Sequence, residues 1–203
     1  LKRHGIKKRI VVVPTGIEKV KILRKSELRK RYKLSRKEKI LLHVGRISRE
    51  KNIDFILMAL KKKPDNWKLI ITSDGPYKKR LEKSVSRLGI KNIIFTGFVP
   101  QNRLNELYFL ADVLVVASKS ETQSIVVAEA AARGLPVVAL DTPVIGNFVR
   151  RNNAGIVANK KNFLSAAKKL LAGKKSAIIK GYTIEETTKS LLNIYKSLSP
   201  SSP

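Results

Sequence analysis

The chain of 203 residues contains no cysteine, one tryptophan and only two histidines. Without cysteine it can form no disulfide framework and no thiolate-ligated zinc site, and it offers no thiol nucleophile. The histidines, His4 and His43, lie in different segments and have no companions at metal-ligand spacing. His43 stands inside an apolar run, where a packing role is more common than a ligand role. Cysteine and histidine chemistry therefore gives no lead to the function.

Long apolar runs and a secretory signal are missing as well. No run approaches the roughly 20 apolar residues that a membrane-spanning helix needs, and the start, Leu1 to Gly5, lacks the apolar core of a signal peptide. A hydrophobic content of 43% is nevertheless ample for a packed core. The chain does not begin with methionine, and its only methionine is Met58. We therefore expect an excised part of a longer protein, or a chain that lacks its natural start.

Acidic residues are scarce, with 15 Asp and Glu against 43 Lys and Arg, which gives a formal net charge of +28. The basic residues are densest between Lys19 and Lys39. Such a field attracts phosphate, nucleic acid or an anionic membrane surface. The alternative is a solvated surface that serves only solubility. Both interpretations stay open, because the sequence does not show whether these residues share one face.

Apolar runs of strand length alternate with helical periodicity from Lys39 onward, and this alternation predicts an α/β fold. The expected form is a Rossmann-like parallel sheet with helices on both faces. A further run, Ile10 to Pro14, also has the character of a strand, but a basic helix separates it from the rest. The strands of the sheet are expected at 40–44, 67–71, 92–96, 112–117, 136–140 and 155–158.

Ligands of parallel sheets bind beyond the carboxyl ends of the strands. The unusual loops of this chain all follow expected strands, namely Gly45-Arg46, Asp74-Gly75-Pro76, Gly97-Phe98 and 118–121. Arg46 and Lys51 bracket the start of the next helix, where two cations can grip a diphosphate. This convergence predicts a ligand site at the carboxyl edge of the sheet.

Two acidic residues, Glu121 and Glu129, stand eight positions apart around the start of an apolar helix. The free N–H groups and positive end of such a helix favour a phosphate, and the carboxylates can accept hydrogen bonds from sugar or ribose hydroxyls. The alternative is structural. Ser118-x-x-Glu121 and Ser120-x-x-Gln123 both have the form of a capping box, and Glu129 can be a partly solvated helix residue.

In order and spacing, these motifs resemble the C-terminal, nucleotide-binding half of a GT-B retaining glycosyltransferase of family four, which includes sucrose-, mannosyl- and glycolipid-synthesising enzymes. The residues that carry the resemblance are Pro14-Thr15-Gly16-Ile17, Gly45-Arg46 with Glu50-Lys51, Asp74-Gly75-Pro76, Thr96-Gly97-Phe98-Val99-Pro100, Ala111-Asp112, Ser118, Glu121-x7-Glu129-Ala130 and Gly134-Leu135-Pro136-Val137-Val138.

The resemblance implies roles for these residues. Arg46 and Lys51 would hold the donor diphosphate and stabilise the charge of the leaving nucleotide, Glu121 would contact the donor sugar, and Glu129 the ribose. Glu121, Arg46 and Lys51 form the expected catalytic set. The other expected substrate contacts are Gly45, Gly75, backbone near Phe98 and Val99 that would face the base, and the N–H cradle of Thr122, Gln123, Ser124 and Ile125.

The resemblance also implies partners and a domain division. The donor is a nucleotide diphosphate sugar, with a UDP-sugar favoured over a GDP-sugar, and no metal or other cofactor is expected because the cations replace it. We divide the chain into an interdomain lead-in of strand and basic helix at 1–38, a nucleotide-sugar-binding domain at 39–182, a helix at 183–198 and a disordered tail at 199–203. That helix would pack on an acceptor domain that is missing from this chain, so the chain alone is expected to be inactive.

The chain departs from the family pattern in two segments. Ser124 stands where the family usually has glycine, and 141–147 replaces a Gly-Gly-x-x-Glu segment. The segment 120–123, Ser-Glu-Thr-Gln, is similar to the corresponding segment of bacterial enzymes that glucosylate diacylglycerol. This similarity favours a lipid or glycan acceptor and a cytoplasmic protein that is peripheral on the inner membrane face.

A different class of function remains as the alternative, a non-catalytic basic protein that binds nucleic acid or an anionic membrane. Nucleic acid is disfavoured because helix-turn-helix and RNA-recognition signatures are absent and aromatic residues make up only 6%. A Rossmann dehydrogenase is disfavoured because no expected strand is followed by G-x-G-x-x-G.

Overall fold

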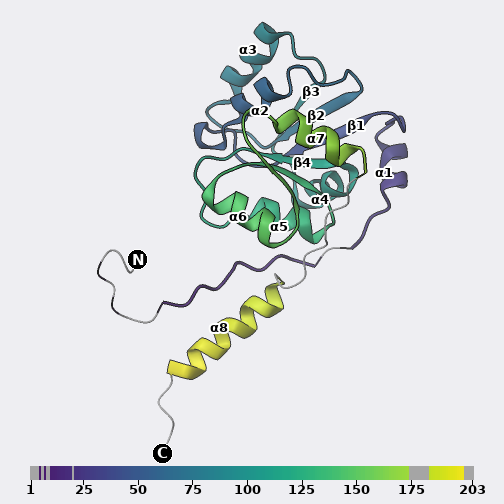
Figure 1. Cartoon of the computed structure of the whole chain (residues 1–203). Coiled ribbons are helices and arrows are strands. Elements are labelled where there is room, and N and C mark those ends of the chain that lie inside the picture. The colour runs from purple at the N-terminus through teal and green to yellow at the C-terminus, as the bar shows by residue number, and fades with distance from the viewer. Residues whose placement is uncertain (1–4, 6, 8–9, 20, 174–182, 199–203) are drawn as a thin grey trace, which may run out of the picture.

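The computed structural model describes residues 5, 7, 10–19, 21–173 and 183–198. Its centre is a single parallel sheet of six strands in the order β3-β2-β1-β4-β5-β6 (Figure 1). The predicted fold class, a Rossmann-like parallel sheet between helices, is confirmed. The strands are β1 (Lys39–His43), β2 (Trp67–Thr72), β3 (Ile93–Gly97), β4 (Val113–Val116), β5 (Val137–Leu140) and β6 (Gly155–Ala158).

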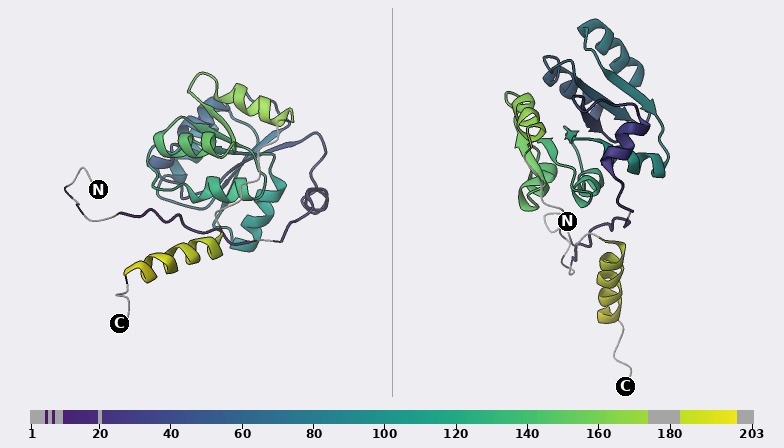
Figure 2. Two further views of the ribbon diagram at one scale, coloured as in Figure 1. Left: turned by 60° about the horizontal axis from the view of Figure 1, so that its bottom comes forward. Right: turned by 90° about the vertical axis from the view of Figure 1, so that its right-hand side faces the viewer.

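Helices cover both faces of the sheet, as two views show (Figure 2). Alternate side chains of each strand enter opposite cores because successive residues of a strand point to opposite faces. In β1, Leu41 joins one buried cluster, whereas Ile40 and Leu42 join the other. The first cluster is covered by α2 (Ile53–Ala59), α3 (Lys78–Leu88) and α7 (Phe163–Leu171), the second by α1 (Lys25–Arg31), α4 (Gln101–Leu110), α5 (Ile125–Ala132) and α6 (Pro143–Arg151).

The strand order reverses direction at β1. The chain runs outward from β1 through β2 to β3 and then returns to place β4 on the other side of β1. The loops that follow β1 and β4 therefore lie side by side at the carboxyl edge of the sheet and lead to helices on opposite faces, α2 and α5. In open α/β sheets such a switch point is where ligands bind.

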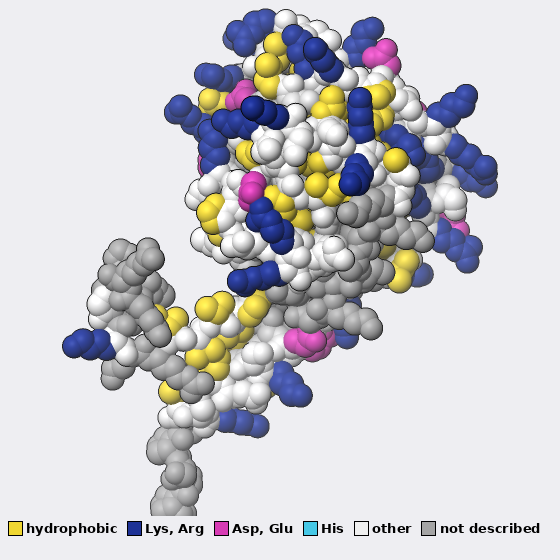
Figure 3. Space-filling view, viewed as in Figure 1, with side chains coloured by type: hydrophobic (Ala, Val, Ile, Leu, Met, Phe, Trp, Pro, Cys, Tyr) yellow, Lys and Arg dark blue, Asp and Glu magenta, His cyan; other side chains and the backbone are white. Residues whose placement is uncertain are grey.

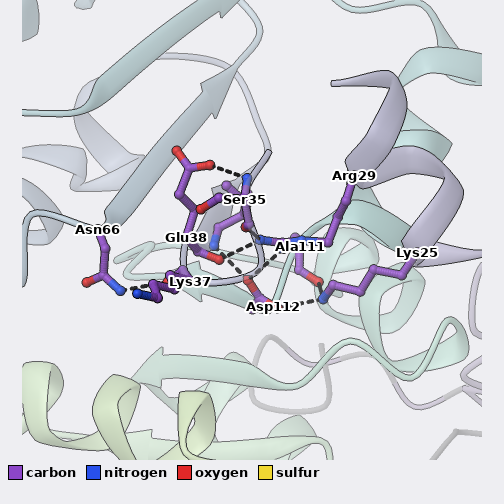
Figure 4. Close-up of polar contacts among 9 residues, drawn as sticks. Lys25, Arg29, Ser35, Lys37, Glu38, Asn66, Ala111 and Asp112 are labelled. Atoms are coloured by element: carbon purple, nitrogen blue, oxygen red, sulfur yellow. Dashed lines mark hydrogen bonds and ion pairs between the residues drawn. The ribbon is translucent and has the colours of Figure 1, made fainter. Parts of the chain in front are cut away.

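The basic helix α1 is anchored to the sheet (Figure 4). Lys25 Nζ lies 2.7 Å from Asp112 Oδ1, and Arg29 Nη1 lies 3.8 Å from Asp112 Oδ2. The same carboxylate accepts a hydrogen bond from Ile40 N at the start of β1 (2.7 Å). Arg31 pairs with Glu106 of α4 at 2.5 Å. Several cations of the densest basic segment therefore tie α1 to the domain.

The strand that the sequence predicts at Ile10–Pro14 is not formed. This stretch has no regular structure in the described residues, and the Val12 side chain is 84% exposed. A strand needs a neighbour to take up its backbone groups, and none pairs with residues 10–14 among the described residues. Three residues further on, Ile17 forms an isolated parallel bridge with Thr183. That bridge brings the segment to the start of α8 (Ile184–Leu198).

Helix α8 begins with a capping box. Thr183 N donates to Glu186 Oε2 (3.0 Å), and Glu186 N donates to Thr183 Oγ1 (3.2 Å). Apolar side chains form an exposed stripe on this helix (Figure 3), and its members are Ile184, Leu191, Leu192, Tyr195 and Leu198. The predicted tail at 199–203 lies outside the described residues. None of the described helices is long and apolar enough to cross a membrane.

Candidate functional site

The loops after β1 and β4 meet at the switch point and are joined by polar contacts. Lys51 Nζ donates to Glu121 Oε1 over 2.7 Å, and each side chain is only about one-fifth exposed, at 21% and 17%. Lys119 N donates to Glu50 O (2.8 Å), and Asn52 Nδ2 donates to Ala117 O (3.2 Å). The structure therefore brings together Lys51 and Glu121, which are 70 residues apart in sequence.

Two glycines shape the loop after β1 and its contact with the loop after β2. Gly45 has φ +140°, a backbone conformation that favours glycine, and an added Cβ would lie 3.7 Å from Lys51 Cε. A Cβ on Gly75 would lie 2.2 Å from the carbonyl oxygen of Ile47, so the loop after β2 rests directly on the loop after β1. Arg46 follows Gly45 with an exposed side chain that makes no hydrogen bond to a described residue, while its carbonyl oxygen accepts one from Ser48 Oγ (3.3 Å).

The start of α5 offers unused backbone donors. Helix α5 begins after Ser124, which has the left-handed φ of +54°. Across the described residues, no acceptor takes up the N–H groups of Thr122, Gln123, Ser124 and Ile125. The Ser124 hydroxyl oxygen is buried and has no partner there either. Free N–H groups at a helix start are the arrangement that binds anions.

The capping-box interpretation of this segment is wrong. The helix starts at Ile125, after both proposed boxes, and no cap bond from Ser118 to Glu121 or from Ser120 to Gln123 occurs in the described structure. Gln123 instead donates through Nε2 to Thr15 O at 3.4 Å. Thr15 belongs to the segment that also meets α8, where Thr187 Oγ1 donates to Pro14 O (2.8 Å).

Glu129 lies on α5 and faces α4. Tyr108 donates its phenolic hydrogen to Glu129 Oε2 over 2.8 Å. Burial and the nearby Glu129 carboxylate raise the pKa of Tyr108 well above its usual value. Tyr108 was missed by the sequence analysis, because a tyrosine on a short helix gives no sign of the residue that it will meet on the next helix.

His43 is buried at the carboxyl end of β1. Its Nδ1 lies 3.0 Å from Val115 O, whereas Nε2 has no partner in the described structure. Burial, assisted by the charge of Lys51, lowers the pKa of His43 to about 4, against the opposing influence of the Val115 carbonyl and of Glu121. The imidazole is therefore neutral near pH 7. This agrees with the packing role that the sequence favours.

Phe98 and Val99 lie at the end of β3, two strands away from β1. The Phe98 side chain is 81% exposed, and Val99 packs partly against the core. No contact among the described residues joins either of them to Lys51, Glu121 or Glu129, so their expected place near a nucleotide base stays a prediction.

A separate basic surface lies on α3, at the top of Figure 1. Lysines and arginines are scattered over the visible face of the domain, many of them around its edge (Figure 3). On α3 they line a hollow of about 630 Å³ together with Ser84, and they are Lys79, Arg80, Lys83 and Arg87. Over the described ranges, no group of three or more His, Asp or Glu side chains is arranged to hold a metal ion.

Comparison with known proteins identifies the family. The family model of glycosyl transferases group 1 matches residues 24–182, which is more than half of the chain. The chain therefore belongs to the group 1 glycosyl transferases. It is 35% identical over 167 residues to alpha-monoglucosyldiacylglycerol synthase of Streptococcus pneumoniae, covering 77% of this chain and 38% of that protein.

Other relatives and solved structures agree with the family and the fold. Sulfoquinovosyl transferase SQD2 of Arabidopsis thaliana is 35% identical over 133 residues, covering 65% of this chain and 25% of that protein. Sucrose-phosphate synthase of Thermosynechococcus elongatus superposes with a TM-score of 0.78 at 23% identity, over 92% of this chain and 52% of that structure. Anabaena HepE, solved with UDP-glucose, superposes with a TM-score of 0.67 at 19% identity, over 86% of this chain and 52% of its own.

The chain spans between 25% and 45% of the length of the curated relatives that it matches. The resemblance to one half of a GT-B glycosyltransferase is confirmed by the family match and by the shared fold.

Proposed function

We propose that this chain is the donor-binding part of a retaining glycosyltransferase. It would hold a nucleotide diphosphate sugar, with a UDP-sugar favoured and a GDP-sugar possible in its place, while the sugar passes to a membrane lipid or a glycan. The observation that carries the proposal is the Lys51–Glu121 pair at the switch point, 2.7 Å long and next to the free N–H groups at the start of α5.

The pair can bind both parts of the donor. A lysine ammonium has three N–H donors, so Lys51 can keep its bond to Glu121 and still donate to a phosphate oxygen. No described residue bonds Glu121 Oε2, which leaves this oxygen for a hydroxyl of the sugar. Arg46, exposed beside them, would complete the cationic grip on the diphosphate.

These cations would also serve the chemistry. Negative charge grows on the nucleotide diphosphate as the bond to the sugar breaks, and fixed cations and backbone N–H groups stabilise it. We propose that Arg46, Lys51 and the N–H groups of 122–125 supply this stabilisation without a metal. Glu121 would hold the sugar through its hydroxyls during the transfer.

The acceptor would bind to a second domain of the same enzyme. The exposed apolar stripe of α8 suits a contact with that domain, because such stripes are normally covered. Relatives whose names include monoglucosyldiacylglycerol and phosphatidylinositol monomannoside support a lipid acceptor. Such an acceptor would place the protein in the cytoplasm, on the inner face of the membrane.

A calorimetric titration with UDP, UDP-glucose, GDP and GDP-mannose tests the proposal. We expect selective binding of one base, weakened more than tenfold by Arg46→Ala. Arg87→Ala, on the α3 surface, is the matched control because it removes the same charge from another part of the chain. Equal, salt-sensitive binding of all four ligands, reduced alike by both substitutions, would instead favour the non-catalytic basic protein.

A further inference from the structure

Glu129 is held by a hydrogen bond from one side only. The phenol of Tyr108, 1% exposed, donates to Glu129 Oε2 over 2.8 Å, whereas Glu129 is itself half-buried. No described residue donates to Glu129 Oε1. One carboxylate oxygen is thus fixed by the protein and the other is left available.

Arg133 fixes the frame around this contact. Its guanidinium lies over the Tyr108 ring, 4.9 Å from the ring centre. Its Nη1 donates to Glu129 O (2.8 Å), and its Nε donates to Asn105 Oδ1 (2.8 Å). Arg133 therefore joins α4 to the end of α5 beside this contact, but among the described residues its guanidinium makes no bond to the Glu129 carboxylate.

We propose that Tyr108 is a positioning residue that holds the Glu129 carboxylate in the orientation that receives the ribose hydroxyls of the donor. The inference rests on the proposed function, because it deepens the role of Glu129 in the same site. Tyr108 itself would not touch the ligand, since its side chain is buried.

The chemistry of the pair supports this role. The raised pKa of Tyr108 keeps the phenol protonated at any ordinary pH, so it acts as a donor to the carboxylate. With Oε2 engaged, the free oxygen Oε1 can accept from a hydroxyl of the ligand. A carboxylate that is already oriented avoids the cost of immobilising a side chain on binding.

The test compares UDP with 2′,3′-dideoxyuridine 5′-diphosphate, which lacks both ribose hydroxyls. Calorimetry on the unaltered chain should give tighter binding of UDP. In Tyr108→Phe we expect UDP affinity to fall about threefold to tenfold, as loss of orientation implies, with the affinity for the dideoxy analogue unchanged. An equal loss for both ligands would show a merely structural role and overturn the inference.

A second variant covers the case in which Tyr108→Phe does not fold. Arg133→Gln leaves the phenol in place, so we expect the preference for UDP over the dideoxy analogue to change less than about twofold. Loss of that preference would mean that the helix frame, and not the phenol, orients Glu129. If the unaltered chain bound UDP but showed no preference, the ribose contact would be wrong. If it bound no UDP at all, the donor proposal would fail with it.

Discussion

Glu121 and Glu129 stand eight residues apart, and the structure holds them in different ways. Glu121 lies in a loop and pairs with Lys51, a flexible and partly exposed cation. Glu129 lies inside a helix and accepts from a buried phenol on the neighbouring helix. The first contact joins two loops and can be shared with a ligand. The second is part of the packing between α4 and α5. If the proposed donor binds here, the loop side of the site can therefore adapt to it, whereas the helix side is already in place.

The largest loss of folding stability is expected on the loop side of the site, from the substitution Gly75→Ala. The new Cβ would lie 2.2 Å from the Ile47 carbonyl, against backbone that cannot move aside. We expect a loss of about 3 kcal/mol in the free energy of unfolding, the upper range for overpacking. Chemical denaturation measures this value.

Gly89→Ala is the matched control for that substitution. Gly89 has a positive φ, +62°, unlike Gly75, and a Cβ there meets nothing within 4 Å. Only backbone strain of about 1 kcal/mol should result. Equal losses in the two variants would show that the close contact between the loops after β1 and β2 does not contribute to folding stability.

The next largest effect is a loss of folding stability in acid. It arises from His43, the last residue of β1, which directly precedes the loop after β1. Its pKa of about 4 is below the ordinary 6.5, so the unfolded chain takes up a proton before the folded chain does. The stability that this neutral histidine provides is present above pH 6.5 and is lost as the pH falls towards 4. We expect about 2 kcal/mol to be lost between pH 7 and pH 5, measured by denaturation at each pH.

An NMR titration of the His43 imidazole separates this effect from that of the carboxylates. Asp74 and Glu106 also have lowered pKa values, held by hydrogen bonds from Gly75 N and Tyr32, but they are protonated only at lower pH. Because the charge of Lys51 lowers the pKa of His43, Lys51→Met should raise it. A His43 that titrates near 6.5 in the folded chain would contradict this explanation.

An effect of similar size distinguishes the two glutamates directly. Glu129→Ala leaves the buried hydroxyl of Tyr108 without its acceptor, which costs about 1–3 kcal/mol. Glu121→Ala leaves only a partly exposed lysine unpaired and should cost less than about 1 kcal/mol. Thermal unfolding of both variants measures the difference. The comparison fails if Glu121→Ala is the more destabilising of the two.

The smallest effect is the coupling of Lys51 with Glu121. A double-mutant cycle of Lys51→Ala and Glu121→Ala should give about 0.5–1 kcal/mol in the free chain, as is usual for pairs near the surface. A bound diphosphate offers Lys51 a second acceptor, so the coupling should fall when UDP is present. A coupling that is zero in the free chain would mean that the ion pair is not formed in solution.

The parts of the fold that follow from local pattern were predictable. Apolar runs such as the one around Val113–Val116 become strands because both faces of the sheet are buried. Helix α6 was not predicted, although Pro143 at its first position is a typical start signal. From the sequence, the segment 141–147 was noted only as a departure from the family motif, and no helix was assigned to it. The strand predicted at Ile10–Pro14 failed because apolar character alone does not supply a neighbouring strand.

The site was predictable only in part. The loops at strand ends indicated where Lys51 and Glu121 would meet, because parallel strands bring their carboxyl ends to one edge. The contact of Tyr108 with Glu129 and the anchoring of α1 by Asp112 depend on how helices pack over the sheet. Neither has a sequence spacing that identifies it. For the same reason the basic segment around α1 could not be divided in advance into paired and solvated charges.

The most direct test of the central claim is a calorimetric titration of Glu121→Ala and Glu129→Ala with UDP and UDP-glucose. If Glu121 holds the sugar and Glu129 the ribose, Glu121→Ala should keep the affinity for UDP and lose only the extra affinity for UDP-glucose. Glu129→Ala should weaken both ligands to a similar degree. Two variants that bind both ligands as tightly as the unaltered chain would contradict the assignment of these glutamates to a donor site.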